Sequence, residues 1–235
     1  MDVSRKDAVS NHRAVIIGAG RIGAGFNWND DEYTHAGAYR ALSDRVELVG
    51  FVEPDLERRV KAGLKWSVPA YDNVAIALEA LKPDIVSVCV QPVQQREALI
   101  SLCGQQQIVG IWCEKPYFCN FNYGWPPIQV NYLRRADPRH RKFAKMCNCD
   151  KELVVYAKDD LHTRCHFEDL ASWWKVPLKY YPIKEGPCSY FMGEPPYRME
   201  GFALGGIDGG DCMKAMLGNL LDHVDNGTEL WSPAA

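Results

Sequence analysis

The glycine-rich turn G-A-G-R-I-G, which begins at Gly18, has the residue types that allow a backbone to hold a pyrophosphate. It follows a short apolar run over residues 14–17 that is rich in β-branched residues and predicts a buried strand. In such a turn the first glycine permits a tight bend, the second lets phosphate approach the backbone, and the third lets a helix pack on the strand. The amides at the start of that helix favour the negative charge. The residues expected to contact a dinucleotide here are Gly18, Gly20, Arg21, Ile22 and Gly23.

A carboxylate at the end of the next predicted strand, residues 46–52, indicates which dinucleotide is bound. Glu53 stands where a carboxylate accepts hydrogen bonds from ribose hydroxyls and repels a 2′-phosphate, which favours NAD over NADP. It follows Gly23 by 30 residues, more than the usual ~20, and the surplus in residues 26–35 is interpreted as an insertion that delays the helix. Arg58 and Arg59 keep NADP open as an alternative.

A reactive side chain is predicted at Glu114-Lys115-Pro116, directly after the buried run 108–113. Ligands of open α/β sheets bind outside the carboxyl ends of the strands, so a lysine at this point would face the nicotinamide. A lysine can exchange a proton at neutral pH when burial and neighbours lower its pKa. Pro116 restricts the backbone and suggests a specified turn. The competing interpretation is a surface lysine paired with Glu114.

The elements that must position these groups alternate along the first half of the chain. Apolar runs at 14–18, 46–52, 84–90 and 108–113 predict strands, and helical patterns lie between them at 36–42, 56–62, 74–81 and 94–105. Alternation of this kind predicts an α/β fold with right-handed crossovers. We expect a Rossmann doubly wound parallel sheet over residues 1–133.

The pattern changes after Pro116. Residues 117–127 read as a loop and 128–133 alternate as a strand. Beyond it the sequence predicts a reduced α+β domain over residues 134–235 for substrate binding and oligomerisation. Its expected elements are a helix at 138–146, a strand at 152–157, a helix at 167–174, short strands within 177–210 and a helix at 211–224. A short open sheet leaves edges exposed, so a homo-oligomer formed through that sheet is expected.

Composition limits the classes of partner. The chain has 47% hydrophobic and 24% charged residues, typical of a globular protein, and its 27 basic residues nearly balance its 30 acidic ones. No overall field would draw it to nucleic acid or to an anionic membrane, which favours a small-molecule partner. Nine scattered cysteines indicate a reducing compartment. Because the first 12 residues lack a signal-like apolar stretch and no long apolar run follows, a cytoplasmic location is expected.

Four motifs in order resemble those of the glucose-fructose oxidoreductase, inositol dehydrogenase and MocA family (Gfo/Idh/MocA). They are the glycine turn, E-K-P at 114–116, V-N-Y-L-R-R at 130–135 and the H-F-E-D-L that begins at His166. The resemblance covers residues 14 to about 175. It implies a dehydrogenase that passes a hydride between NAD and a secondary alcohol of a sugar, nucleotide sugar or cyclic polyol.

The resemblance also implies roles for individual side chains. Lys115 would lie beside the substrate hydroxyl and assist its proton loss, and His166 would act as acid or base on the same oxygen. His162 stands four residues before His166, where many members of the family carry aspartate, and is included as a catalytic candidate. Further candidates are Gln91, Pro92 and Glu114 for the cofactor, and Lys115, Arg134, Arg135 and His166 for the substrate.

The sequence departs from the family in length and in some motif positions. Members generally exceed 300 residues, and the missing parts fall in the helix after E-K-P and in the sheet of the second domain. Arg96 stands where the family commonly has histidine. These departures keep a second interpretation open, that of a dinucleotide-binding sensor or assembly subunit that has lost turnover.

A third interpretation is a metal-dependent hydrolase. His162 and His166 have the i, i+4 spacing of two metal ligands on one helical face. The glutamate of an H-E-x-x-H site is missing, and Cys147 and Cys149 do not form a C-x-x-C half-site. No metal is therefore expected.

Overall fold

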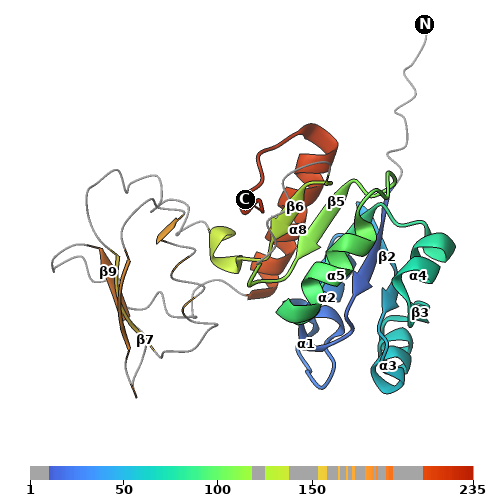
Figure 1. Ribbon diagram of the computed structural model, residues 1–235, viewed down its shortest axis with the longest axis horizontal. Helices are drawn as coiled ribbons and strands as arrows, with labels where there is room; N and C mark the ends of the chain where they lie inside the picture. The colour runs from blue at the N-terminus through green and yellow to red at the C-terminus, as the bar shows by residue number, and fades with distance from the viewer. Residues whose placement is uncertain are drawn as a thin grey trace, which may run out of the picture.

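The structure is a computed structural model that describes residues 11–117, 125–137, 153–157, 164, 168, 171–172, 178–182, 184, 189–192 and 209–234. Strands and helices alternate through its first half, as Figure 1 shows. The strands there are β1 (His12–Ile17), β2 (Val46–Val52), β3 (Ala70–Tyr71), β4 (Ile85–Val88), β5 (Gly110–Cys113) and β6 (Ile128–Val130). The helices are α1 (Arg21–Ala24), η1 (Asp31–Tyr33), α2 (His35–Ala41), α3 (Leu56–Trp66), α4 (Val74–Leu81), α5 (Pro92–Leu102) and η2 (Leu133–Arg135).

These six strands form one parallel sheet in the order β3-β2-β1-β4-β5-β6. The order reverses between β1 and β4, which lie side by side although they are far apart in sequence. This is the doubly wound Rossmann arrangement, and the predicted fold class is confirmed. The crevice at the reversal is where such sheets bind ligands.

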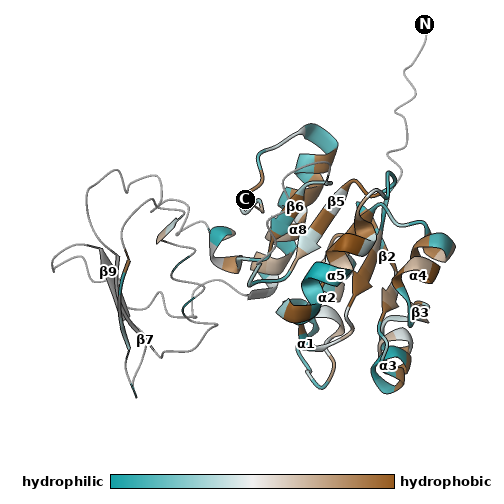
Figure 2. Cartoon of the chain, viewed as in Figure 1, coloured by the Kyte–Doolittle hydropathy of each residue, from teal (hydrophilic) through white to brown (hydrophobic). Residues whose placement is uncertain are grey.

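Helices cover the two faces of the sheet and divide the apolar core in two. One cluster of buried residues combines β1 and β2 with α2, α3 and the C-terminal helix α8 (Gly209–Asn226). The other combines strands with α4 and α5. Brown apolar ribbon lies along β2 and β5 in Figure 2, whereas teal polar residues lie along outer parts of the helices. No helix in the described part of the chain has the length and apolarity needed to cross a bilayer.

The C-terminal helix belongs by its contacts to the Rossmann sheet. Met213, Met216, Leu217, Leu220 and Leu221 of α8 are buried in the same cluster as β1 and α2. A Cβ built on Gly110 of β5 would lie 3.3 Å from Leu220, so a glycine there allows close packing. The boundary at residue 133 stays a prediction, but the last helix contributes to the core of the first part.

The tail after α8 adds a short antiparallel bridge to the edge of β6. The amide of Val130 donates to the Ser232 carbonyl at 2.7 Å, and the amide of Ala234 donates to the Ile128 carbonyl at 3.0 Å. The edge of the parallel sheet is thus paired by the end of the chain.

A second, smaller sheet contains β7 (Leu153–Ala157), β8 (Leu178–Pro182) and β9 (Ser189–Met192) in the order β8-β7-β9. The predicted strand at 152–157 is confirmed, and two short strands occur within the predicted stretch 177–210. The predicted helix at 138–146 lies outside the described residues. Assembly through this sheet stays a prediction.

Local differences from the expected elements have simple causes. Strand β3 was not predicted, because two residues are too few to show a periodicity. Strand β6 ends at Val130 rather than at residue 133, because the Tyr132 amide turns back to the Val130 carbonyl. Helix α1 begins at Arg21, directly after the glycine turn, and has only four residues, whereas α2 begins at His35. The insertion thus interrupts the helix, where the sequence predicted that it delays it.

A charged cluster ties the start of β1 to the end of α8. His12 Nδ1 lies 2.8 Å from Asp84 Oδ2, and its Nε2 lies 2.9 Å from Asp225 Oδ1. The hydrogen bond with Asp84 is the main cause that raises the pKa of His12 to about 9. Although burial raises the pKa values of Asp84 and Asp225, their hydrogen bonds with His12 hold both below the usual value.

Stability is therefore expected to depend on pH through His12. Its folded pKa exceeds its unfolded value of 6.5, so its contribution is complete below that pH and is lost as pH rises through about 9. The aspartates act on the acid side, where their contribution disappears as pH falls below about 4. In urea unfolding, His12→Asn should remove about 1 to 2 kcal/mol at pH ~6 and nearly nothing at pH ~10. An equal loss at both pH values would contradict this assignment.

Candidate functional site

The glycine turn has the geometry of a phosphate cradle. Gly18 has φ +98°, and a Cβ there would lie 2.6 Å from the Cys89 carbonyl oxygen. A Cβ on Gly23 would lie 2.1 Å from the Gly18 carbonyl oxygen. Around Gly20, by contrast, no heavy atom of the described residues lies within 4 Å of such a Cβ. The fold thus requires the first and third glycines, whereas the second leaves open space at the start of α1.

A cleft of about 530 Å³ opens beside this turn, at the carboxyl ends of the central strands. Its lining comes from the glycine turn, the end of β2, the start of α4 and the segment after β4. The lining includes Gly18, Gly20, Glu53, Arg58, Asn73, Val90, Gln91 and Gln94. Four predicted cofactor residues, Gly18, Gly20, Glu53 and Gln91, thus meet in one cleft. Because their glycine cradle is open and their carboxylate lies at the same cleft, these residues fit a dinucleotide.

Glu53 is already engaged in the cleft wall. Its Oε2 accepts from the Ala19 amide at 2.9 Å, and its Oε1 accepts from the Asp55 amide at 3.1 Å and lies 3.3 Å from Arg58. The residue is only 4% exposed, so its carboxylate is fixed in position. An ionised carboxylate accepts about four hydrogen bonds, which leaves capacity for a ribose hydroxyl.

The E-K-P turn follows β5, one strand away from the segment that lines the cleft. The Glu114 amide donates to the Val88 carbonyl at 2.9 Å, directly before the cleft residues that begin at Cys89. Lys115 is partly buried, and the peptide bond between Lys115 and Pro116 is cis. Gln95 of α5 donates to the Glu114 carbonyl at 2.6 Å. The turn is thus held between β4 and α5, beside the cleft.

Glu114, a predicted cofactor residue, directs its carboxylate into the protein. Its Oε1 accepts from Asn131 and lies 3.1 Å from His35 Nε2, and its Oε2 accepts from the Lys115 amide at 3.2 Å. Burial is the main cause that lowers the pKa of His35, although the bond to Glu114 opposes it. These contacts show Glu114 as an anchor of the E-K-P turn.

Sequence reasoning missed His35 and Asn131, which complete this anchor. His35 begins α2, and Tyr39 one turn later on the same face is also fully buried. The signal available in the sequence was a histidine and a tyrosine at positions i and i+4, facing a buried strand that contains the polar Ser87. Without the sheet order, nothing placed that face next to E-K-P.

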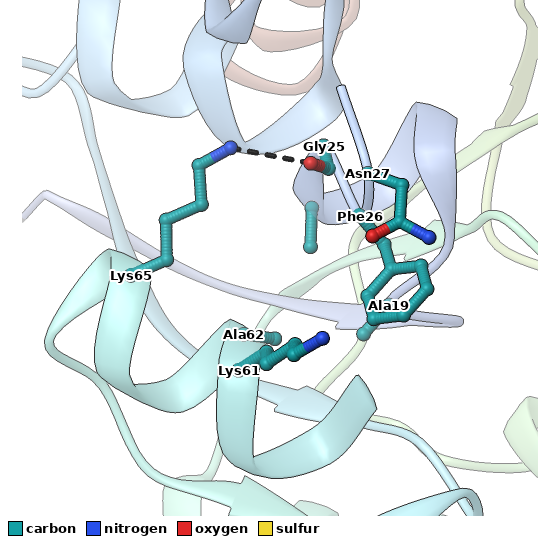
Figure 3. Close-up of a pocket in the computed structure, with 8 residues that line it drawn as sticks. Ala19, Gly25, Phe26, Asn27, Lys61, Ala62 and Lys65 are labelled. Atoms are coloured by element: carbon teal, nitrogen blue, oxygen red, sulfur yellow. Dashed lines mark hydrogen bonds between the residues drawn. The ribbon is translucent and has the colours of Figure 1, made fainter. Parts of the chain in front are cut away.

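A second hollow of about 260 Å³ lies between the insertion and α3 (Figure 3). Phe26 and Asn27 line one side, and Lys61 and Lys65 line the other. Lys65 lies 2.5 Å from Asp31 and donates to the Gly25 carbonyl, and Lys61 lies 2.7 Å from Glu57. Since both lysines have carboxylate partners, the hollow is explained by packing of the insertion against α3.

The other predicted site residues divide into three groups. Arg21 lies over the Trp28 ring at 4.7 Å, Ile22 packs on the core, and Pro92 begins α5. Arg135 donates to the Trp231 carbonyl at 2.9 Å and lies over the Tyr132 ring, whereas only the backbone of Arg134 is described. His162 and His166 lie outside the described residues, so their roles stay predictions.

Comparison with known proteins agrees with this geometry. Residues 12–123 match the family model described as an oxidoreductase family with an NAD-binding Rossmann fold, the Gfo/Idh/MocA family. A search of the curated proteins finds no match.

Solved structures share the fold at low sequence identity. An Agrobacterium radiobacter oxidoreductase in complex with NAD+, L-tartaric acid and magnesium has a TM-score of 0.69 and 10% identity, over 95% of this chain and 91% of its own. The WlbA dehydrogenase from Bordetella pertussis, in complex with NADH and UDP-GlcNAcA, has a TM-score of 0.67 and 13% identity, over 95% and 91%. A myo-inositol dehydrogenase from Corynebacterium glutamicum has a TM-score of 0.64 and 13% identity, over 94% and 90%.

The sheet order, the open second glycine of the turn and the family match lead to the same assignment. They support an NAD-binding oxidoreductase. The Rossmann part of the chain, residues 12–123, matches the Gfo/Idh/MocA oxidoreductase family.

Proposed function

We propose that this protein is a dehydrogenase that oxidises a secondary alcohol of a sugar, nucleotide sugar or cyclic polyol, with NAD as the hydride acceptor. The observation that carries the proposal is the position of the E-K-P turn. It lies beside β4, whose following residues line the cleft that begins at the glycine turn. A partly buried lysine at that place suits a group that takes a proton from a substrate hydroxyl.

In this proposal the chain supplies binding, orientation and proton transfer. Glu53 and the glycine turn hold the dinucleotide, Gln91 and Pro92 border it, and Lys115 withdraws the hydroxyl proton. His166 is proposed as the acid or base on the same oxygen, and His162 as a further catalytic candidate. Arg134 and Arg135 are the candidates for a charged substrate group, although Arg135 already contacts the Trp231 carbonyl.

The substrate class rests on the family and on structural relatives. WlbA was crystallised with a nucleotide sugar, and another relative is a myo-inositol dehydrogenase. NAD is preferred over NADP in this proposal because the buried carboxylate of Glu53 would repel a 2′-phosphate. We also propose a cytoplasmic enzyme that assembles as a homo-oligomer through its second domain.

A substrate panel tests the proposal. The protein is assayed with NAD and, separately, with NADP on a panel of sugars, nucleotide sugars and inositols. With NAD it should form NADH when given at least one member of this panel. NADP should react with at least about tenfold lower kcat/KM. Tight NAD binding without turnover across the panel would favour the alternative, a dinucleotide-binding protein that acts as a sensor or assembly subunit. Turnover abolished by EDTA would instead favour metal chemistry.

A further inference from the structure

Four buried polar side chains form a continuous hydrogen-bonded row that ends at the E-K-P turn. Tyr39 Oη lies 2.7 Å from Ser87 Oγ, Ser87 Oγ lies 2.9 Å from His35 Nδ1, and His35 Nε2 lies 3.1 Å from Glu114 Oε1. Tyr39, Ser87 and His35 have no exposed surface. Buried polar groups are costly unless every member has a partner, so this row has a specific arrangement.

The chemistry of the groups allows one direction for the protons. The carboxylate of Glu114 only accepts, so His35 Nε2 carries the hydrogen that it donates. Burial keeps the imidazole neutral by lowering its pKa, which makes Nδ1 an acceptor for the Ser87 hydroxyl. The oxygen of Ser87 then accepts from the Tyr39 hydroxyl. Every bond in the row is satisfied in this single arrangement.

Aromatic packing holds the His35 imidazole in the orientation that its two hydrogen bonds, to Ser87 and to Glu114, require. The rings of His35 and Trp112 have centroids 3.7 Å apart, and Tyr39 meets the same Trp112 ring edge-on at 6.1 Å. Trp112 lies on β5, two residues before Glu114. The row therefore joins α2 and β4 to the strand that carries the reactive turn.

Resting on the proposed function, we infer that His35 is a positioning residue for Lys115. His35 and Asn131 hold the Glu114 carboxylate, whose other oxygen accepts from the Lys115 amide. The backbone of the reactive lysine is thereby fixed from within the core. His35 touches neither substrate nor cofactor in this scheme, and it acts through Glu114.

Two substitutions of His35 distinguish a positioning role from a purely structural role in core packing. His35→Gln retains an amide nitrogen close to the place of Nε2 and can still donate to Glu114. His35→Asn places its amide close to Nδ1 and cannot reach Glu114. We expect His35→Asn to lower kcat by about 10- to 100-fold with the dissociation constant of NAD nearly unchanged, and His35→Gln to restore most of kcat.

A second readout does not need turnover. Labelling of lysines with pyridoxal phosphate and borohydride, followed by peptide mass mapping, gives the rate at Lys115 relative to exposed Lys214 in the same sample. That ratio should change about threefold or more in His35→Asn and stay near the wild-type value in His35→Gln. If both histidine variants fail to fold, Glu114→Gln replaces them, since its amide nitrogen cannot accept from the Lys115 amide and the ratio should change likewise.

The outcomes distinguish the two proposals. A wild-type protein without turnover on the substrate panel would overturn the proposed function, while the labelling ratio would still report on His35. Equal kcat values and equal labelling ratios for the folded Asn and Gln variants would overturn the positioning role. A loss confined to NAD affinity in His35→Asn would overturn it too, because that result would place His35 on the cofactor side.

Discussion

Lys115→Met is expected to lower kcat by about 10³-fold while the dissociation constant of NAD stays within about twofold of the wild-type value. Methionine is unbranched and only one heavy atom shorter than lysine, so the backbone of the E-K-P turn and its bond to Glu114 should persist. What is lost is the amine that takes the hydroxyl proton. Steady-state formation of NADH measures kcat, and titration with NAD followed by tryptophan fluorescence measures the dissociation constant.

The matched control for this result is Lys214→Met. Lys214 lies exposed on α8, away from the cleft lining, and its loss should leave kcat unchanged. A Lys115→Met protein that retains more than about a tenth of wild-type kcat would show that the lysine does not transfer the proton.

The second large effect is expected at Gly20. Its φ of −75° and ψ of −160° are open to any residue, and a Cβ there meets no described atom within 4 Å. Gly20→Leu should therefore fold with a nearly unchanged melting temperature. The added side chain would occupy the space by which a pyrophosphate approaches the backbone, so we expect NAD affinity to fall by about 100-fold or more.

Two other glycines serve as references for that experiment. Gly23→Ala should instead lower the melting temperature, since its Cβ would lie 2.1 Å from the Gly18 carbonyl oxygen. Gly218→Leu, on α8 and also without a described atom within 4 Å, should retain NAD binding. Calorimetric titration with NAD and thermal unfolding of the three variants give both quantities. Undiminished NAD binding by Gly20→Leu would place the dinucleotide elsewhere.

Structural features that depend on residues close together in the sequence could be predicted from it. The strand before Gly18, the turn itself and E-K-P after a buried run each lie within a few residues, and apolar periodicity together with glycine chemistry locates them. The parallel direction of the strands followed from their alternation with helices. Boundaries differed by a few residues, because helix and strand ends depend on caps and turns such as the Tyr132 bond.

Contacts between distant parts of the chain could not be predicted. His35 and Glu114 are 79 residues apart, and only the order of the strands brings α2 against the end of β5. The inward direction of Glu114 follows from that contact, and sequence reasoning, which named Glu114 as a cofactor candidate, had no signal for it. A polar Ser87 inside an apolar strand was a local sign that a buried partner existed, as was the i, i+4 spacing of His35 and Tyr39.

The packing of α8 on the Rossmann sheet has a consequence for how the protein is made. A ribosome that has released residues as far as Asp137 has supplied all six parallel strands, yet the helix that covers β5 and α2 has not been synthesised. Until it emerges, an apolar face stays open to chaperones and to other nascent chains. The nucleotide-binding unit is therefore completed only after α8 has been synthesised.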